Sequence, residues 1–203
     1  MSTAVATEPL VVGPDDNGLL MTPEDFDEIT EYDENYRYEL INGVFIVNPI
    51  PGHAERDLNE ELGHLLRNYQ EQHPGILNKT LFEEYVRTSH SRRRADRVIW
   101  AGLGRVPNFK TDVPTIVVEF VSKSRRDRHR DYVLKRDEYL ELGIKEYWII
   151  DRFQRTMTVF RCAKKGPEQQ IIGENDVYRT PLLPDFELPL SRLLTVADDW
   201  ETS

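Results

Sequence analysis

The chain has 203 residues, of which 39 % are hydrophobic and 31 % are charged, a composition typical of one globular domain rather than of a disordered or membrane-spanning chain. The single cysteine, Cys162, excludes an internal disulfide and a thiol-rich metal site, and no apolar stretch approaches the roughly 18 residues that span a bilayer. The formal net charge of −10 argues against a uniformly basic nucleic-acid binder. Together with the lack of an export signal, these features predict a cytoplasmic protein.

The first part of the chain is predicted to contain a tail, a short helix and a hairpin. Residues 1–20 mix small, acidic, glycine and proline residues without periodicity and are expected to be disordered. Thr22, followed by proline and two acids, is typical of the N-cap of a helix that reaches about Thr30. Asn42-Gly43 between two apolar-rich runs predicts a tight β-hairpin, with Glu39 beside the turn.

Helices and strands are predicted to be mixed in the rest of the chain. Leucines recur at helical spacing between about His53 and Tyr69, which indicates an amphipathic helix. The fold class is therefore α/β, with a mixed central sheet flanked by helices, in a single domain of residues 21–196 followed by a short tail of residues 197–203. Strands are expected near residues 80–86, 97–100, 115–121, 146–151 and 157–161, and a second long helix at residues 130–142 ended by Gly143.

Charge is divided unequally along the chain. Between Arg87 and Arg136 there are 14 lysines and arginines against 5 acids, a net charge of +9, so the remainder carries −19. Such a run is often only a solvated surface, but it can also contact phosphates.

Two carboxylates flank or interrupt apolar strands. Asp96 precedes Arg97-Val98-Ile99-Trp100, and Glu119 lies inside the run from Ile116 to Val121. A buried acid is costly unless it is paired, hydrogen-bonded or metal-bound. The two acids are therefore candidates for a divalent-metal site, and a structural ion pair is the alternative.

A lysine on the second predicted helix is a candidate partner for these acids. Asp131, Lys135, Tyr139 and Gly143 repeat every four residues and so follow nearly one side of the helix, which starts soon after the Glu119 strand. The alternative is an ordinary surface pair between Asp131 and Lys135, worth ~0.3 to 0.5 kcal/mol.

Other common chemistries lack their motifs. The chain contains no phosphate-binding G-x-x-x-x-G-K-[ST] or G-x-G-x-x-G sequence and no G-x-S-x-G elbow. Its histidines are not spaced as zinc ligands.

At these residues the chain resembles the Uma-two family of restriction endonucleases, within the PD-(D/E)XK nuclease superfamily. The resemblance covers about residues 21–194. It rests on several motifs in the same order: YELINGVF, the Pro-Gly-His stretch, Ala95-Asp96, VVEFVSKS, the Asp131/Lys135/Tyr139/Gly143 helix, KEYWIIDR and TPLLPDFELPLSRLL.

The resemblance implies a restriction-endonuclease-like fold and a set of catalytic residues. Asp96 would be the superfamily aspartate, Glu119 the second acid and Glu39 an additional acid. The superfamily lysine is absent from Glu119-Phe120-Val121. Lys135 would replace it from the following helix, and Lys123 is the rival.

The implied activity is metal-dependent hydrolysis of phosphodiester bonds in DNA. Mg²⁺ or Mn²⁺ would be held by Asp96 and Glu119, and a duplex-cutting enzyme of this kind would act as a homodimer. The alternative is an inactive nuclease-like fold that serves as a nucleic-acid or protein binding and regulatory module. The nucleic-acid contacts are assigned to Arg92, Arg93, Arg94, Arg125, Arg126 and Arg128.

Overall fold

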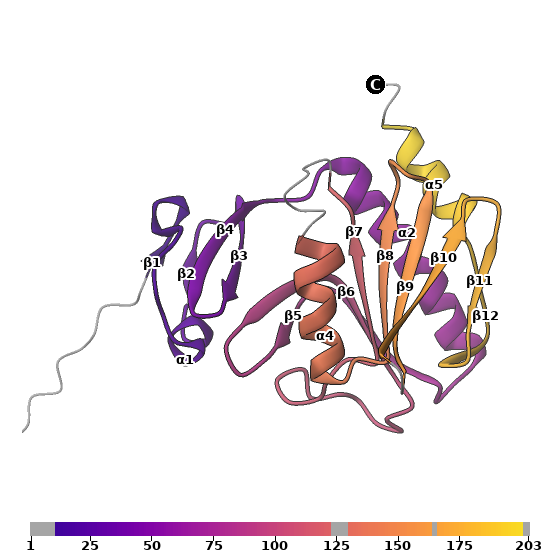
Figure 1. The fold of residues 1–203 in the computed structure, drawn as a ribbon, viewed down its shortest axis with the longest axis horizontal. Helices are drawn as coiled ribbons and strands as arrows, with labels where there is room; N and C mark the ends of the chain where they lie inside the picture. Colours follow the sequence, from indigo (N-terminus) through magenta and orange to yellow (C-terminus); the bar gives the residue numbers. More distant parts are fainter. Residues whose placement is uncertain (1–10, 123–129, 164–165, 201–203) are drawn as a thin grey trace, which may run out of the picture. The chain divides into compact units, whose positions relative to one another are not determined.

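The computed structural model describes residues 11–122, 130–163 and 166–200 (Figure 1). Their backbone forms two compact units. One takes in the described residues up to Ile50 together with Arg87–Arg94, and the other takes in Pro51–Val86 and the described residues from Ala95 onward. None of the helices in the described part of the chain is both long and apolar enough to cross a membrane.

The first unit is built around a hairpin. The predicted turn is confirmed, because Asn42 and Gly43 both have positive φ angles, 49° and 79°, as a two-residue turn between twisted strands requires. Thr22 accepts a hydrogen bond from the amide of Asp25 and so caps the first α-helix, which is shorter than expected. The elements are β1 (Val11–Val12), a 3₁₀ turn η1 (Pro14–Asp16), α1 (Pro23–Asp27), β2 (Glu31–Tyr32), β3 (Tyr36–Ile41) and β4 (Val44–Pro49).

Ordered structure begins earlier than the predicted tail allows. Strand β1 lies inside residues 1–20 and pairs in parallel with β2, Val11 opposite Glu31. Within the same unit, Leu40 of β3 lies opposite Arg92 at the start of a long strand, β6, which continues into the second unit. The division of the backbone into two units is not visible in the sequence pattern, and the single domain of residues 21–196 stays a prediction.

The second unit confirms the predicted mixed sheet. Its strands are ordered β10-β9-β8-β7-β6, and β5 also pairs with β6. Strands β7 and β8 are parallel, whereas the neighbouring pairs are antiparallel. The elements are α2 (His53–Gln72), β5 (Leu77–Arg87), β6 (Arg92–Ala101), β7 (Ile116–Phe120), a π-helical segment η2 (Arg130–Lys135), α4 (Arg136–Leu142), β8 (Glu146–Asp151), β9 (Thr156–Ala163), β10 (Gly166–Gly173), β11 (Val177–Thr180), β12 (Leu183–Pro189) and α5 (Leu190–Asp198).

Helices cover both faces of this sheet, with α4 on one face and α2 on the other (Figure 1). Because side chains alternate along a strand, β7 contributes to both layers. Ile116, Val118 and Phe120 pack in the core that includes α2 and α5. Val117 and Val121 pack in the core that includes Tyr139 and Leu140 of α4. Glu119, in phase with these two valines, therefore belongs to the α4 side.

The second predicted helix is present but not uniform. Its first turns, Arg130–Lys135, are π-helical, and α4 itself is confined to Arg136–Leu142. Gly143 ends α4 with a φ of 94°, a left-handed conformation that glycine adopts without a Cβ penalty. Short π segments within helices occur often at functional sites.

The C-terminal part is more regular than the sequence suggests. The Pro-rich stretch, expected as a wrapping segment, forms the antiparallel pair β11–β12. The brief terminal helix is confirmed as α5, which extends to Asp198 and so enters the predicted tail of residues 197–203. Strand β10 was not predicted, because its side chains are mostly exposed and show no apolar alternation.

Candidate active site

Asp96 and Glu119 lie side by side on neighbouring strands of the second unit. In the antiparallel ladder of β6 and β7, Arg97 is opposite Val118 and Val98 is opposite Val117. One step further in this register, Asp96 falls opposite Glu119. Opposed residues of an antiparallel pair point to the same face of a sheet, so both carboxylates belong to the face that α4 covers.

The Asp96 carboxylate is buried and is anchored to the β7 backbone. The residue is 7 % exposed. Its Oδ2 accepts a hydrogen bond of 2.7 Å from the amide of Phe120, the residue after Glu119. Its main-chain carbonyl accepts a second bond, 2.8 Å long, from Nδ2 of Asn59 on α2. The sheet thus fixes the Asp96 carboxylate, and helix α2 fixes its main-chain carbonyl.

Glu119 is bound by two side chains from the helical segment that follows. The Lys135 ammonium lies 2.9 Å from Oε1 of Glu119, and the Tyr139 hydroxyl donates to the same oxygen at 3.2 Å. Glu119 is 3 % exposed and Lys135 is 2 % exposed. The four-residue spacing of Lys135 and Tyr139 therefore corresponds to one side of the helix, as the sequence predicts, and Lys135 is not a surface residue.

The donor set suits a hard divalent cation that keeps water ligands. Mg²⁺ is commonly held by one or two carboxylates, with waters and substrate phosphates completing the shell. Asp96 and Glu119 provide such a pair. No group of three or more histidine, cysteine, aspartate or glutamate residues able to hold a metal occurs among the described residues. The residues present therefore fit Mg²⁺ or Mn²⁺ better than zinc or an all-protein calcium cage.

Arg97, next to Asp96 in the strand, lies on the opposite face and is an additional feature that sequence reasoning missed. Its guanidinium donates to Asn59 and Thr80, and the residue is 3 % exposed. Burial lowers the pKa of Arg97 to about 10, so the side chain stays charged at neutral pH. The sequence does contain a signal for Arg97. Consecutive residues of a strand point to opposite faces, so Asp96 and Arg97 place one charged side chain on each face of the sheet.

Glu39 belongs to the first unit. It lies in β3 and its carboxylate accepts hydrogen bonds of 3.1 Å from Nδ2 of Asn48 and from the amide of Arg94. Its role as an additional catalytic acid stays a prediction.

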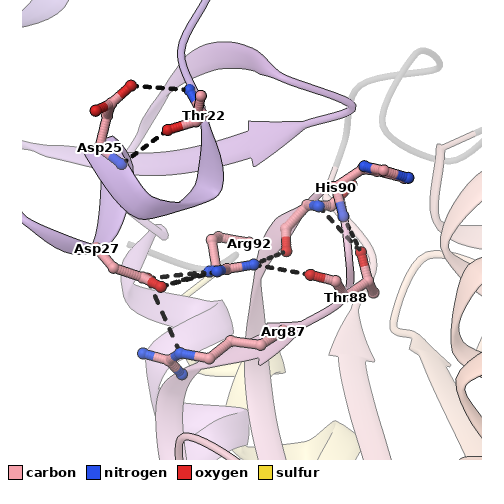
Figure 2. Close-up of polar contacts among 8 residues, drawn as sticks. Thr22, Asp25, Asp27, Arg87, Thr88, His90 and Arg92 are labelled. Atoms are coloured by element: carbon pink, nitrogen blue, oxygen red, sulfur yellow. Dashed lines mark hydrogen bonds and ion pairs between the residues drawn. The ribbon is translucent and has the colours of Figure 1, made fainter.

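Arg92, Arg93 and Arg94 lie at the start of β6. A phosphate contact would need exposed guanidinium groups, but two of these arginines are buried. Arg92 is 8 % exposed, and its guanidinium grips the Asp27 carboxylate through Nε and Nη2 and donates to the carbonyl of Thr88 (Figure 2). Arg87 approaches the same carboxylate at 4.0 Å. Arg93 is buried, whereas Arg94 is partly exposed. Arg92 thus joins α1 to β6 inside the first unit, and Arg94 is more exposed than Arg92 and Arg93.

The remaining predicted residues fall outside the described part of the chain. These are the rival lysine, Lys123, and the arginines Arg125, Arg126 and Arg128.

Glu146 is a second buried acid within an apolar strand, and its surroundings are those of a structural carboxylate. Its two oxygens accept hydrogen bonds of 2.8 to 2.9 Å from the indole of Trp148 and the hydroxyls of Tyr178 and Thr180, and from the guanidinium of Arg161. Burial and the nearby carboxylate raise the pKa of Tyr178. Although burial acts in the opposite direction, the hydrogen bond to Glu146 raises the pKa of Arg161. These four donors come from three strands, so Glu146 joins β8 to β9 and β11.

We expect Glu146→Gln to lower the free energy of unfolding by about 2 kcal/mol or more, because a neutral amide then faces donors that were bound to a carboxylate. Urea denaturation measures the change. Metal binding and cleavage per folded molecule should remain at the wild-type level. A loss of metal binding without a loss of stability would contradict the structural assignment.

Comparison with known proteins shows the family and the fold of the chain. Residues 23–191 match the Uma2 family, whose description is "Putative restriction endonuclease". Among solved structures, the chain is similar to a putative nuclease of the DUF820 family from Anabaena variabilis, with a TM-score of 0.71 and 17 % sequence identity. The match covers 87 % of this chain and 99 % of that one, and it shows a shared fold.

No curated protein matches the chain. The family match nevertheless spans most of the sequence and includes both strands that carry Asp96 and Glu119. Restriction-endonuclease-like families generally use divalent metal ions and act on nucleic acid. By this match over residues 23–191, the chain belongs to the Uma2 family.

Proposed function

We propose that the protein is a metal-dependent nuclease that hydrolyses phosphodiester bonds of DNA. The observation that carries the proposal is the buried contact of 2.9 Å between the Lys135 ammonium and the Glu119 carboxylate. Glu119 lies on β7, which pairs with the strand that carries Asp96. A pair of acids beside a lysine can support phosphodiester hydrolysis, because it offers two ligands for a hard cation and one positive charge for the phosphate.

Each residue has a separate task in this proposal. Asp96 and Glu119 would hold Mg²⁺ or Mn²⁺, which when bound lowers the pKa of a water molecule and stabilises charge on the phosphate. Lys135 orients the attacking water or stabilises the negative charge that develops on the phosphate oxygens. Tyr139, which donates to the same Glu119 oxygen as Lys135, holds the Glu119 carboxylate in place.

The proposal is tested by incubating purified protein with supercoiled and linear DNA in Mg²⁺, in Mn²⁺ and in a chelator. Wild-type protein should cleave DNA with either metal and not in the chelator. Asp96→Asn, purified identically, should be inactive, which controls for contaminating nucleases. Cleavage by Asp96→Asn at the wild-type rate would contradict the proposal. DNA binding by wild-type protein with no cleavage would instead support a binding module with a nuclease-like fold.

DNA contact is proposed for the basic segment between Arg87 and Arg136, because its net charge of +9 contrasts with the rest of the chain. We expect DNA affinity to fall steeply with salt, as counterions are released. Replacing Arg125, Arg126 and Arg128 together by alanine should lower the slope of log affinity against log salt by about 2 to 3, which fluorescence anisotropy at several salt concentrations measures.

A matched control removes the same charge elsewhere. Arg67, Lys79 and Lys145 are exposed and lie outside the arginine cluster. Their joint replacement by alanine should leave the salt slope nearly unchanged. Equal slopes for both triple variants would show that only net charge matters and would contradict a specific phosphate contact.

A further inference from the structure

We propose that Asn59 and Arg97 form a positioning relay for Asp96, which sets where the Asp96 main chain, and hence its carboxylate, lies. The role of the relay in catalysis rests on the proposed function. Its hydrogen bonds involve protein groups alone and can be tested without metal or substrate. Neither residue belongs to the pair of metal ligands, and both lie on the α2 side of the sheet, away from Lys135.

Asn59 links Arg97 to Asp96 through the two ends of its amide. Oδ1 of Asn59 accepts from Nε of Arg97 at 2.7 Å, and Nδ2 of Asn59 donates to the Asp96 carbonyl at 2.8 Å. Nη2 of Arg97 also donates to the main-chain carbonyl of Asn59 at 2.7 Å. A guanidinium can only donate, so it turns the amide oxygen of Asn59 toward itself. The amide nitrogen must then face Asp96.

Burial of the charged Arg97 side chain lowers the stability of the fold. Its three hydrogen-bond partners, Oδ1 and the carbonyl of Asn59 and Oγ1 of Thr80, are all neutral. Burying a charged group away from water costs stability, even where a nearby carboxylate, here that of Glu60, favours the charge. Residues that break a folding rule in this way are expected where function needs them. Arg97 acts on Asp96 through Asn59, because it fixes the orientation of the Asn59 amide that donates to the Asp96 carbonyl.

Helix α2 also makes room for the guanidinium. Gly63 lies one turn beyond Asn59, and a Cβ built on it would come within 2.5 Å of Nη2 of Arg97. Any larger residue at position 63 must therefore displace Arg97. Glycine lowers the stability of a helix interior by roughly 0.5 to 1 kcal/mol relative to alanine, so its presence here is explained by the space it leaves.

One further hydrogen bond connects the relay to the candidate metal site. Asp96 Oδ2 accepts from the Phe120 amide at 2.7 Å, beside Glu119. If the carbonyl of Asp96 loses its anchor, the β6 backbone at Asp96 can shift and this bond should weaken. Protection of the Phe120 amide against hydrogen exchange therefore reports on the placement of the carboxylate, without metal or DNA.

Two variants interrupt the relay. Asn59→Leu combined with Arg97→Met removes both polar side chains at once and leaves no buried charge at position 97, which offsets part of the cost of the lost hydrogen bonds, so the variant should fold. Gly63→Ala instead displaces the guanidinium and keeps every polar group. Thr80→Val is the control, because it removes one contact of Arg97 and does not touch Asp96.

The first readout is amide exchange measured by NMR in the metal-free protein. The exchange rate of Phe120, divided by that of Val118 in the same strand, should rise about tenfold in both relay variants. Global destabilisation accelerates both amides and cancels in this ratio. Thr80→Val should keep the wild-type ratio. An unchanged ratio in both relay variants would overturn the proposal, because Arg97 and Asn59 would then only join helix to strand.

The second readout is Mn²⁺ affinity by calorimetry. Both relay variants should bind about tenfold more weakly than wild-type protein, while Thr80→Val binds normally. If wild-type protein binds no Mn²⁺ but the Phe120 ratio rises in the variants, the relay stands and the proposed nuclease function fails. If Mn²⁺ binds normally to all variants and the ratio is unchanged, the nuclease proposal is unaffected and the relay is wrong.

Discussion

Replacement of Lys135 by alanine is expected to reduce DNA cleavage about 100-fold or more without weakening Mn²⁺ binding. The ammonium is buried and contacts Glu119 at 2.9 Å, so it can place its charge where negative charge develops on a phosphate bound to the same metal site. Removing a positive charge that stabilises the transition state lowers the rate, and the Lys135→Ala variant keeps both carboxylates that would bind the metal. Single-turnover cleavage and calorimetry measure the two quantities.

Two control variants test whether the position of the lysine, and not merely the loss of one positive charge, lowers the cleavage rate. Lys145→Ala removes an exposed ammonium from the same unit and should keep the wild-type rate. Lys123→Ala tests the rival lysine and should have the smaller effect. If Lys123→Ala is inactive and Lys135→Ala retains most of its rate, the assignment of the site lysine is wrong.

Mn²⁺ binding is expected to disappear in both Asp96→Asn and Glu119→Gln. Each variant keeps the size of the side chain and replaces a carboxylate oxygen by a neutral nitrogen donor, which a hard cation does not accept as a ligand. Calorimetric titration of the folded variants measures the loss. Normal binding by both variants would show that Mn²⁺ binds elsewhere in the protein.

The two acids should differ in their effect on stability. Glu119→Gln removes the carboxylate that faces the buried Lys135 ammonium, and breaking a buried ion pair on one side costs about 3 to 5 kcal/mol. The sequence alone leads to the expectation that losing a metal ligand barely affects stability. For Asp96→Asn we expect a smaller loss of stability, because the asparagine side-chain oxygen can still accept the hydrogen bond from the Phe120 amide.

A double variant distinguishes the structural from the chemical role of Glu119. Glu119→Gln combined with Lys135→Met removes both charges of the pair and should recover most of the lost stability, since no uncompensated charge remains. It should still bind no Mn²⁺. Recovery of metal binding together with stability would mean that Glu119 supports the fold and is not a ligand.

Much of the fold follows from local sequence. Asn42 and Gly43 readily adopt the positive φ angles that a tight hairpin turn requires, and the leucines of α2 repeat with the period of one helix face. Glu119 was recognisable because an acid inside an apolar strand needs a partner. These signals need only a few neighbouring residues, so they are readable before any long-range contact is known.

The partners of the buried charges could not be read from the chain in the same way. Arg92 and Arg97 both look like members of a basic surface, yet one binds Asp27, 65 residues away, and the other binds Asn59, 38 residues away. Glu146 resembles Glu119 as an acid in an apolar strand, but four donors from three strands surround it. Strand register and helix packing determine which of these charges meet.

Local patterns and motifs thus suffice to predict the family and the mixed α/β sheet, and to single out Asp96, Glu119 and Lys135 as candidates. The tertiary structure determined that Lys135 faces Glu119, that Arg97 lies behind Asp96 on the other face, and that Arg92 is bound within the protein. The physical reason is the range of the interactions involved. Backbone propensities and side-chain periodicity act over a few residues, whereas the pairing of buried charges depends on groups that only folding brings within about 3 Å of each other.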